Sequence, residues 1–208
     1  MQLSSTAFQD GGVIPDQYAL AAPDAENHFQ LSKNLNPDFS WRDAPAGTKS
    51  FVMLCIDPDA PSKPDDVNKE DREVPADLPR ADFAHWAIVD LPADLNQIKQ
   101  GECSSEVTPG GKKQPPGPSN ARQGINSYTD WFAGDADMGG TYYGYDGPAP
   151  PWNDAIAHRY EFRLLALDVD RCSVDGDFTA DDVLKAVEGH ILGQASLTGT
   201  YTLNPRLR

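Results

Sequence analysis

The chain has 208 residues, of which 39% are hydrophobic and 24% are charged, so it is long enough to bury a sizeable core within one domain. Its 32 acidic and 17 basic residues give a formal net charge of −15. This charge argues against nucleic acid as a partner, because phosphate backbones require a cationic face, and it also opposes docking on anionic lipid surfaces. The three cysteines, Cys55, Cys103 and Cys172, form no CxxC pair and indicate no disulfide framework.

The N-terminal residues 1–10 lack the basic and apolar stretches of a signal peptide, and no apolar run is long enough to cross a membrane. We therefore expect a cytoplasmic protein in a reducing compartment. In such a protein Cys55, which lies within an apolar run, is expected to act as a small buried apolar side chain.

Three apolar runs, residues 51–56, 84–89 and 158–169, are bounded by proline or aspartate and predict buried strands. Within the third run, apolar and charged side chains alternate from Arg159 to Leu164. This alternation is typical of a strand with one exposed face. The chain therefore carries the short, buried strands of a mainly β protein.

Only one segment clearly predicts a helix. Residues 179–182 have the form of a capping box, apolar residues follow at helical spacing as far as Ile191, and Gly193 fits the end of the helix. Residues 95–100 predict a shorter helical turn. Residues 196–203 predict a further strand, with its apolar side chains on one face.

Two polar stretches interrupt this pattern. Residues 63–80 carry prolines among mixed charges, and residues 110–124 are rich in Gly, Pro, Lys and Gln. We interpret both as irregular insertions within a single domain that spans residues 1–208. Each precedes a segment with polar residues at a strand end, so two alternatives stand: they border a site, or they are solvated loops without a role.

Aspartate and histidine residues recur where apolar runs meet proline-rich corners. Residues 57–62 read Asp-Pro-Asp-Ala-Pro-Ser directly after one strand, His85 begins another, and residues 145–151 read Tyr-Asp-Gly-Pro-Ala-Pro-Pro shortly before His158. Polar groups at strand ends, beside turns that proline makes rigid, can form a small pre-organised site.

Taken together and in order, these segments resemble the phosphatidylethanolamine-binding protein family, also called Raf kinase inhibitor-like proteins. Residues 34–41 and 45–50 resemble its bacterial branch, and residues 189–201 extend the resemblance to the tail. The resemblance implies a mainly β fold: a β-sandwich of antiparallel sheets with Greek-key connections, a few helices and a helix near the C-terminus. It also implies a homodimer.

The resemblance further implies a small pocket that accepts an anion such as phosphate or the head group phosphoethanolamine. Asp57, His85 and His158 match the family's pocket residues most directly. The full set that we expect to bind ligand is Asp57, Asp59, His85, Gly147, Pro151, His158 and Tyr160, with Trp86 and Trp152 as apolar pocket walls. For Asp59 a second reading, in which it braces the turn before a proline, is favoured.

The chemistry of these residue types suits an anion. Two imidazoles can each donate an N–H, more strongly when protonated, and a nearby carboxylate favours their charged form. Gly147 would let the backbone approach a ligand closely, and Tyr160 would supply a hydroxyl. No catalytic residue, metal or cofactor is expected on this reading.

The leading hypothesis is a protein that binds a small anion or phospholipid head group and modulates a kinase or protease partner, the modulation resting on the resemblance alone. One rival is a hydrolase in which the His and Asp residues bind a metal or act as acid and base. The sequence contains no HExxH, GxSxG or Walker pattern to support that rival. Another rival is a protein-interaction module in which the pocket is vestigial.

Overall fold

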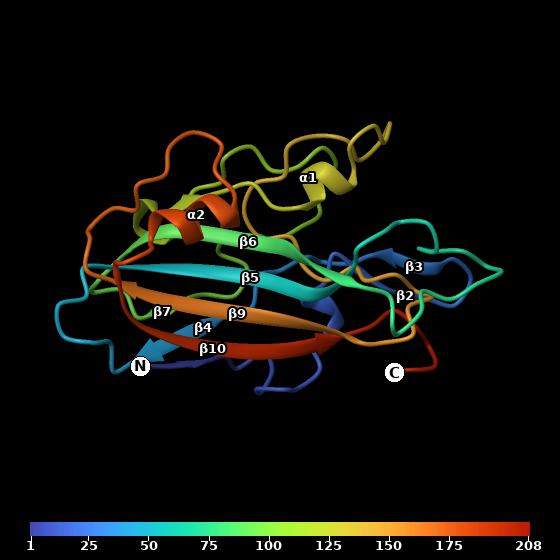
Figure 1. Cartoon of the computed structure of the whole chain (residues 1–208), viewed down its shortest axis with the longest axis horizontal. Coiled ribbons are helices and arrows are strands. Elements are labelled where there is room, and N and C mark those ends of the chain that lie inside the picture. The colour runs from blue at the N-terminus through green and yellow to red at the C-terminus, as the bar shows by residue number, and fades with distance from the viewer.

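The computed structural model describes residues 1–208 and has a five-stranded antiparallel sheet at its centre (Figure 1). The spatial order of its strands is β10, β9, β5, β6 and β8. Because β5 lies between β6 and the much later β9, the chain returns to the sheet by long, Greek-key-like connections. The bounds are β5 Ser50–Pro61, β6 Arg80–Pro92, β8 Arg122–Gln123, β9 His158–Leu167 and β10 Ile191–Tyr201.

A second, smaller sheet packs against one face of the first. It consists of β1 (Gln2–Ser4), β4 (Phe39–Arg42) and β7 (Gln97–Ile98). Its aromatic side chains meet those of the central sheet, since the ring of Phe39 lies 4.7 Å from that of Phe162. The expected β-sandwich is therefore confirmed. The remaining elements are the hairpin of β2 (Ala21–Asp24) and β3 (His28–Leu31), α1 (Tyr128–Trp131), α2 (Ala180–Ala186), and the 3-10 turns Asp16–Tyr18 and Pro118–Asn120.

The apolar run in β5 is continuous because both faces of this strand are covered. On one face, the side chains of Phe51, Met53 and Cys55 join the core shared with the small sheet. On the other face, those of Val52, Leu54 and Ile56 join a second core that α2 closes. Figure 1 shows α2 lying over β6. A strand buried on both faces reads as an unbroken apolar run rather than an alternating one.

The predicted C-terminal helix is present but shorter than expected. The capping box is confirmed, since the Thr179 side chain accepts the N–H of Asp182 while the Asp182 carboxylate accepts the N–H of Thr179. The helix ends at Ala186 instead of Gly193, because Ile191 already pairs with Leu167 as the first residue of β10. Sheet pairing has overridden the helical spacing of the apolar residues.

The prediction of a helical turn at residues 95–100 is wrong. This stretch contains strand β7, in which Ile98 pairs with Phe39 and becomes fully buried in the core. The burial of Ile98 between the two sheets outweighs its local preference. No helix of the structure is long and apolar enough to cross a membrane.

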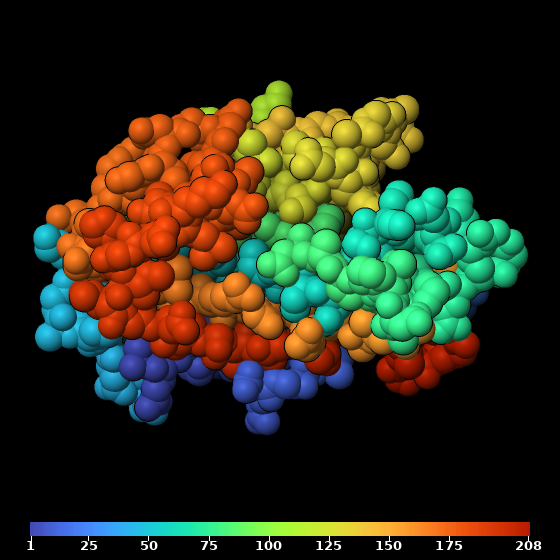
Figure 2. Space-filling view, viewed as in Figure 1, coloured from blue at the N-terminus to red at the C-terminus, as the bar shows by residue number.

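The polar insertion at residues 63–80 is folded around one side chain, Asn153. The Asn153 Nδ2 group donates to the carbonyl oxygens of Asp66, Lys69 and Arg72, while its Oδ1 accepts the N–H of Asn68. Buried amides that satisfy several backbone groups hold a loop in one conformation. This 63–80 segment forms the right-hand end of the molecule in Figure 2, in teal and green.

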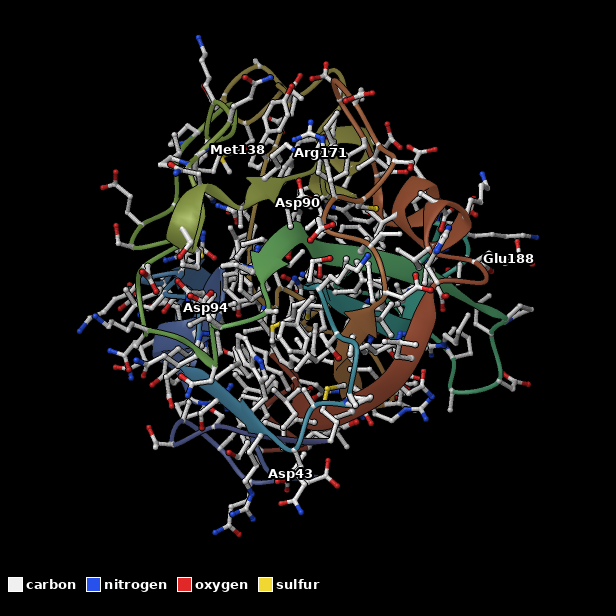
Figure 3. All side chains as sticks on the ribbon, turned by 90° about the vertical axis from the view of Figure 1, so that its left-hand side faces the viewer. Asp43, Asp90, Asp94, Met138, Arg171 and Glu188 are labelled. Carbon is white, nitrogen blue, oxygen red and sulfur yellow. The ribbon has the colours of Figure 1, made fainter.

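Asp90, near the end of β6 that lies far from the 63–80 segment, is a strand-end aspartate with a structural role. Its carboxylate accepts hydrogen bonds from Arg122 Nε at 2.6 Å and from the N–H of Cys172 at 2.8 Å. Figure 3 shows Asp90 below Arg171, whose guanidinium lies 3.9 Å from the same carboxylate. Strand-end carboxylates in this fold therefore include some that only fasten loops.

Candidate functional site

At the end of the central sheet that lies on the right in Figure 1, residues of β5, β6 and β9 line a cavity of about 410 Å³. Its walls come from the ends of β5, β6 and β9, from the β2–β3 hairpin, from the 63–80 segment and from residues 128–138, which we name the α1 segment. In Figure 2 the α1 segment (yellow) lies above the 63–80 segment on this half of the molecule. Of the residues expected to bind ligand, those that line the cavity are Asp57, His85, Pro151, His158 and Tyr160.

A β-bulge aims His85 into this cavity. Cys55 on β5 pairs with Trp86, whereas the next residue, Ile56, pairs with Ala84, so His85 is an extra residue in β6. Such a bulge re-aims a side chain that regular alternation would have placed on the other face. His85 thus lies close to the ring of Tyr160 on β9, with 5.1 Å between the ring centroids.

His158 lines the cavity with both ring nitrogens already engaged. Its Nδ1 donates to Asp57 Oδ2 at 2.7 Å, and its Nε2 donates to Asp154 Oδ2 at 3.0 Å. Arg80 completes the network through two hydrogen bonds to the Asp154 carboxylate, at 2.7 and 3.1 Å. Two carboxylates and two cations balance here, so this network is neutral as a whole.

The surroundings of His158 keep it protonated. Burial alone would lower its pKa, but the hydrogen bonds and charges of Asp154 and Asp57 outweigh burial and raise the pKa to about 9. An imidazolium that donates to two carboxylates has no N–H left for a bound anion. We expected both histidines to donate to a ligand, but His158 has no free N–H with which to do so.

His85, in contrast, keeps one nitrogen free. Its Nδ1 donates to the carbonyl oxygen of Asp146 at 2.8 Å, which is the one side-chain hydrogen bond that His85 makes, so its Nε2 is not engaged by the protein. Burial lowers the pKa of His85, although the Asp57 carboxylate and the bond to Asp146 oppose the change. The neutral ring therefore presents Nε2 as an acceptor, and the protonated ring would present it as a donor.

The hydroxyl of Tyr160 also lacks a partner. Tyr160 is fully buried within β9, lines the cavity, and its hydroxyl makes no hydrogen bond to the protein. A buried polar group without a partner costs free energy of about 1–3 kcal/mol, so such groups usually meet water or a ligand. Tyr160 and His85 are neighbouring rings in the cavity wall, and each carries one polar atom that makes no hydrogen bond to the protein.

The Asp146 carboxylate fixes the backbone that orients His85. It is buried and accepts hydrogen bonds from the side-chain amides of Asn34 and Asn126, at 2.7 and 2.8 Å, and from Lys112 Nζ at 2.6 Å. Lys112 comes from the polar stretch 110–124, so this insertion contributes to the surroundings of the site. These residues carry no distinctive motif, and sequence reasoning missed them.

Sequence reasoning also missed Asp154 and Arg80. Asp154 stands four residues before His158 and is fully buried. A lone aspartate at that position cannot be told from a surface residue without knowing that the chain turns there.

Two of the expected binding residues do not line the cavity. Asp59 forms a pair of hydrogen bonds with Arg159, both at 2.8 Å, and its own N–H donates to Asp57, so it braces the corner between strands. The N–H of Gly147 donates to Asn34 Oδ1 at 2.8 Å. A Cβ at this glycine would lie 2.0 Å from the carbonyl oxygen of Tyr18, so the residue permits close packing of backbone against backbone.

The two tryptophans expected as pocket walls lie elsewhere. Trp86 is fully buried in the core shared by the two sheets, where its Nε1 donates to Gln123 at 2.7 Å, because the bulge leaves it opposite Cys55. Trp152 stacks on the ring of His28, with centroids 3.8 Å apart, outside the cavity lining. The aromatic walls are instead Phe29, Phe83, Tyr128, Trp131 and Phe132.

The arrangement offers little for the rival chemistries. A metal site of the two-histidine type would need a free nitrogen on each ring, and both nitrogens of His158 are held by carboxylates. The same bonds prevent His158 from acting as a base towards a substrate. No group of three or more His, Cys, Asp or Glu side chains in the structure is arranged to hold a metal ion.

Comparison with known proteins identifies the family. Residues 4–202 match the phosphatidylethanolamine-binding protein family. The chain is 33% identical to a UPF0098 protein of Methanothermobacter thermautotrophicus over 201 residues, covering 97% of this chain and 98% of the relative. It is 32% identical to the UPF0098 protein YbhB of Escherichia coli over 202 residues, covering 97% and 100%. The chain therefore belongs to the phosphatidylethanolamine-binding protein family.

Solved structures agree on the fold. A putative phosphatidylethanolamine-binding protein homologue from Chlamydia trachomatis superimposes with a TM-score of 0.64 at 28% identity, covering 96% of this chain and 95% of the other. Escherichia coli YbcL, described as a member of the mammalian PEBP family, superimposes with a TM-score of 0.68 at 23% identity, covering 97% of each chain. The second likeness concerns the fold alone.

Proposed function

We propose that this protein binds a small molecule through a phosphate or similar anionic head group, of the kind found in phospholipids, at the polar end of the cavity. The observation that carries the proposal is that His85 uses only Nδ1 in a hydrogen bond to the protein, while the hydroxyl of the neighbouring Tyr160 ring is buried without a partner. A few convergent polar groups in an otherwise apolar pocket are typical of a ligand site.

The proton balance of binding follows from His85. In the free protein burial lowers its pKa, so the ring is neutral near pH 7 and Nε2 accepts. A bound anion favours the imidazolium, which donates from Nε2 in a charge-assisted hydrogen bond. Binding should therefore take up a proton, and affinity should rise as the pH falls.

Calorimetric titration with inorganic phosphate and with sulfate tests this proposal. Sulfate does not titrate near neutral pH, so any change in its affinity between about pH 5.5 and pH 7.5 reports on the protein, and we expect tighter binding at the lower value. His85→Ala should weaken binding about tenfold or more, since a hydrogen bond to a charged group contributes about 1.5–3 kcal/mol.

His190→Ala provides the matched control. His190 also pairs with a carboxylate, that of Asp168 at 2.8 Å, but it is exposed and does not line the cavity. Its loss should leave the affinity unchanged. Equal affinity of the wild type and a folded His85→Ala variant for both anions would refute the proposal, and circular dichroism establishes that the variant is folded.

A further inference from the structure

Lys112 is connected to His85 through a single residue, Asp146. Lys112 Nζ lies 2.6 Å from Asp146 Oδ1, and the lysine side chain is 13% exposed while that of the aspartate is 1% exposed. The backbone of Asp146 holds His85 twice, since its N–H donates to the His85 carbonyl at 3.1 Å and its carbonyl accepts His85 Nδ1 at 2.8 Å. A charge in the 110–124 stretch thus lies two contacts away from a ring in the cavity wall.

The backbone that carries Lys112 is fixed by close packing. Gly111 has a φ of +83°, in the left-handed region that glycine adopts without strain, and a Cβ there would lie 2.1 Å from the carbonyl oxygen of Thr141. The stretch before Lys112 and the stretch that leads to Asp146 are therefore in direct contact. The ion pair between the two residues does not depend on a flexible loop.

The Asp146 carboxylate has only donors around it. Besides Lys112, the side-chain amides of Asn34 and Asn126 donate to it, at 2.7 and 2.8 Å. An ionised carboxylate accepts hydrogen bonds and donates none, so these contacts match its charged form. Lys112 is the one cation that contacts this buried negative charge.

The titratable and charged groups that face His85 come from several elements. They are Asp57 on β5, His158 and Tyr160 on β9, Tyr128 on α1, and Asp146 in the turn that precedes β9. Burial lowers the pKa of His85, and the charges of Asp57 and Asp146 oppose the change. Each of these two carboxylates is paired with a cation, Asp57 with His158 and Asp146 with Lys112. The negative charges near the ring are thus matched, and burial decides its charge state.

We infer that Lys112 is a positioning residue of the site: by matching the charge of Asp146, it keeps the His85 ring neutral until an anion binds. This inference rests on the proposed function for the role of His85. No lysine or arginine lines the cavity, so the charge of Lys112 acts on the ligand position through Asp146 and His85. The 110–124 stretch would then set the pH range over which binding takes up a proton.

Opposite substitutions in the ion pair test the inference. Lys112→Met leaves the Asp146 charge unmatched, so the His85 ring should titrate at a pH higher by about half a unit or more. Asp146→Asn leaves the Lys112 charge unmatched, so the ring should titrate at a lower pH than in the wild type. NMR titration of the His85 ring, without phosphate or sulfate in the sample, measures both. A general loosening of the site would move both variants in the same direction.

The neighbouring Lys113 provides the matched control. Lys113 is exposed and, unlike Lys112, forms no ion pair. Lys113→Met removes the same charge and should leave the titration of His85 unchanged, whereas Lys112→Arg keeps the charge and should stay close to the wild type. Circular dichroism establishes that each variant is folded. Shifts of the same sign in Lys112→Met and Asp146→Asn, no shift in either, or an equal shift in Lys113→Met would overturn the inference.

Calorimetric titration of the same variants with sulfate separates this inference from the proposed function. If both hold, Lys112→Met should bind sulfate about threefold or more tightly than the wild type at pH 7.5, and Asp146→Asn should bind it more weakly. If the ring titrations shift as expected but sulfate binds to no variant, the proposed function fails and the role of Lys112 in setting the charge of His85 stands. If His85→Ala weakens sulfate binding while the ring titrates alike in all the lysine and aspartate variants, the proposed function stands and the inference fails.

Discussion

Two histidines line the same cavity, and their surroundings differ in almost every respect. His158 is enclosed by carboxylates, donates from both nitrogens and has a raised pKa. His85 is enclosed by aromatic rings, donates from one nitrogen to a backbone carbonyl and has a lowered pKa. One histidine thus holds the pocket together with both of its nitrogens, while its neighbour uses only one nitrogen in a hydrogen bond to the protein.

Replacing each histidine separately should give the largest difference in the free energy of unfolding. His158→Ala leaves the buried Asp57 and Asp154 without their shared cation, so we expect the free energy of unfolding to fall by about 3–5 kcal/mol. His85→Ala removes one hydrogen bond and leaves one carbonyl unpaired, which should cost about 1–3 kcal/mol. Urea unfolding at neutral pH measures both, and a smaller loss for His158→Ala than for His85→Ala would contradict the assigned roles.

The pH dependence of stability should sharpen the same contrast. The folded protein holds the proton on His158 more tightly than the unfolded chain, whose histidines have a pKa of about 6.5. The stabilisation is therefore complete below about pH 6.5 and is lost as the pH rises through about 9, a decrease of up to about 3 kcal/mol. Subtracting the same unfolding series for His158→Gln isolates this contribution, and a difference that does not change with pH would disprove it.

The smallest effect should come from the unpaired hydroxyl of Tyr160. Tyr160→Phe removes a buried group without a partner, so it should raise the free energy of unfolding by about 1 kcal/mol while weakening phosphate binding. Tyr145→Phe is the matched control, because the Tyr145 hydroxyl is equally buried but donates to the carbonyl of Tyr18 at 2.7 Å. Its loss should lower stability by a similar amount. Thermal unfolding distinguishes the two, and destabilisation by Tyr160→Phe would show that its hydroxyl has a protein partner.

The sequence allowed the sandwich and part of the site to be predicted. Apolar runs with polar ends located β5, β6 and β9, and the alternation within β9 correctly placed Tyr160 on the buried face. The Thr179 capping box predicted where α2 begins. These features are local, so the residues that create them stand next to one another in the chain.

What sequence reasoning could not predict depends on contacts between distant residues. The bulge at His85 exists only in the pairing of β6 with β5, so nothing in β6 alone shows that Trp86 faces the core. The network around His158 also comes from three places along the chain, since His158 bonds Asp57 and Asp154, and Arg80 bonds Asp154. Residue types suggested an anion site, but only the geometry shows which donor is already used.

The way in which the 63–80 segment is attached has a consequence for the diversity of this pocket. The amide of Asn153 holds several of its carbonyls, and the carboxylate of Asp154 holds Arg80, so a few polar contacts secure a long stretch of chain. Most of its side chains are therefore free to vary, yet Val67 and Asn68 form part of the cavity wall. Substitutions in the 63–80 segment would therefore change the cavity wall, and with it the preference for a ligand, without changing the β-sandwich.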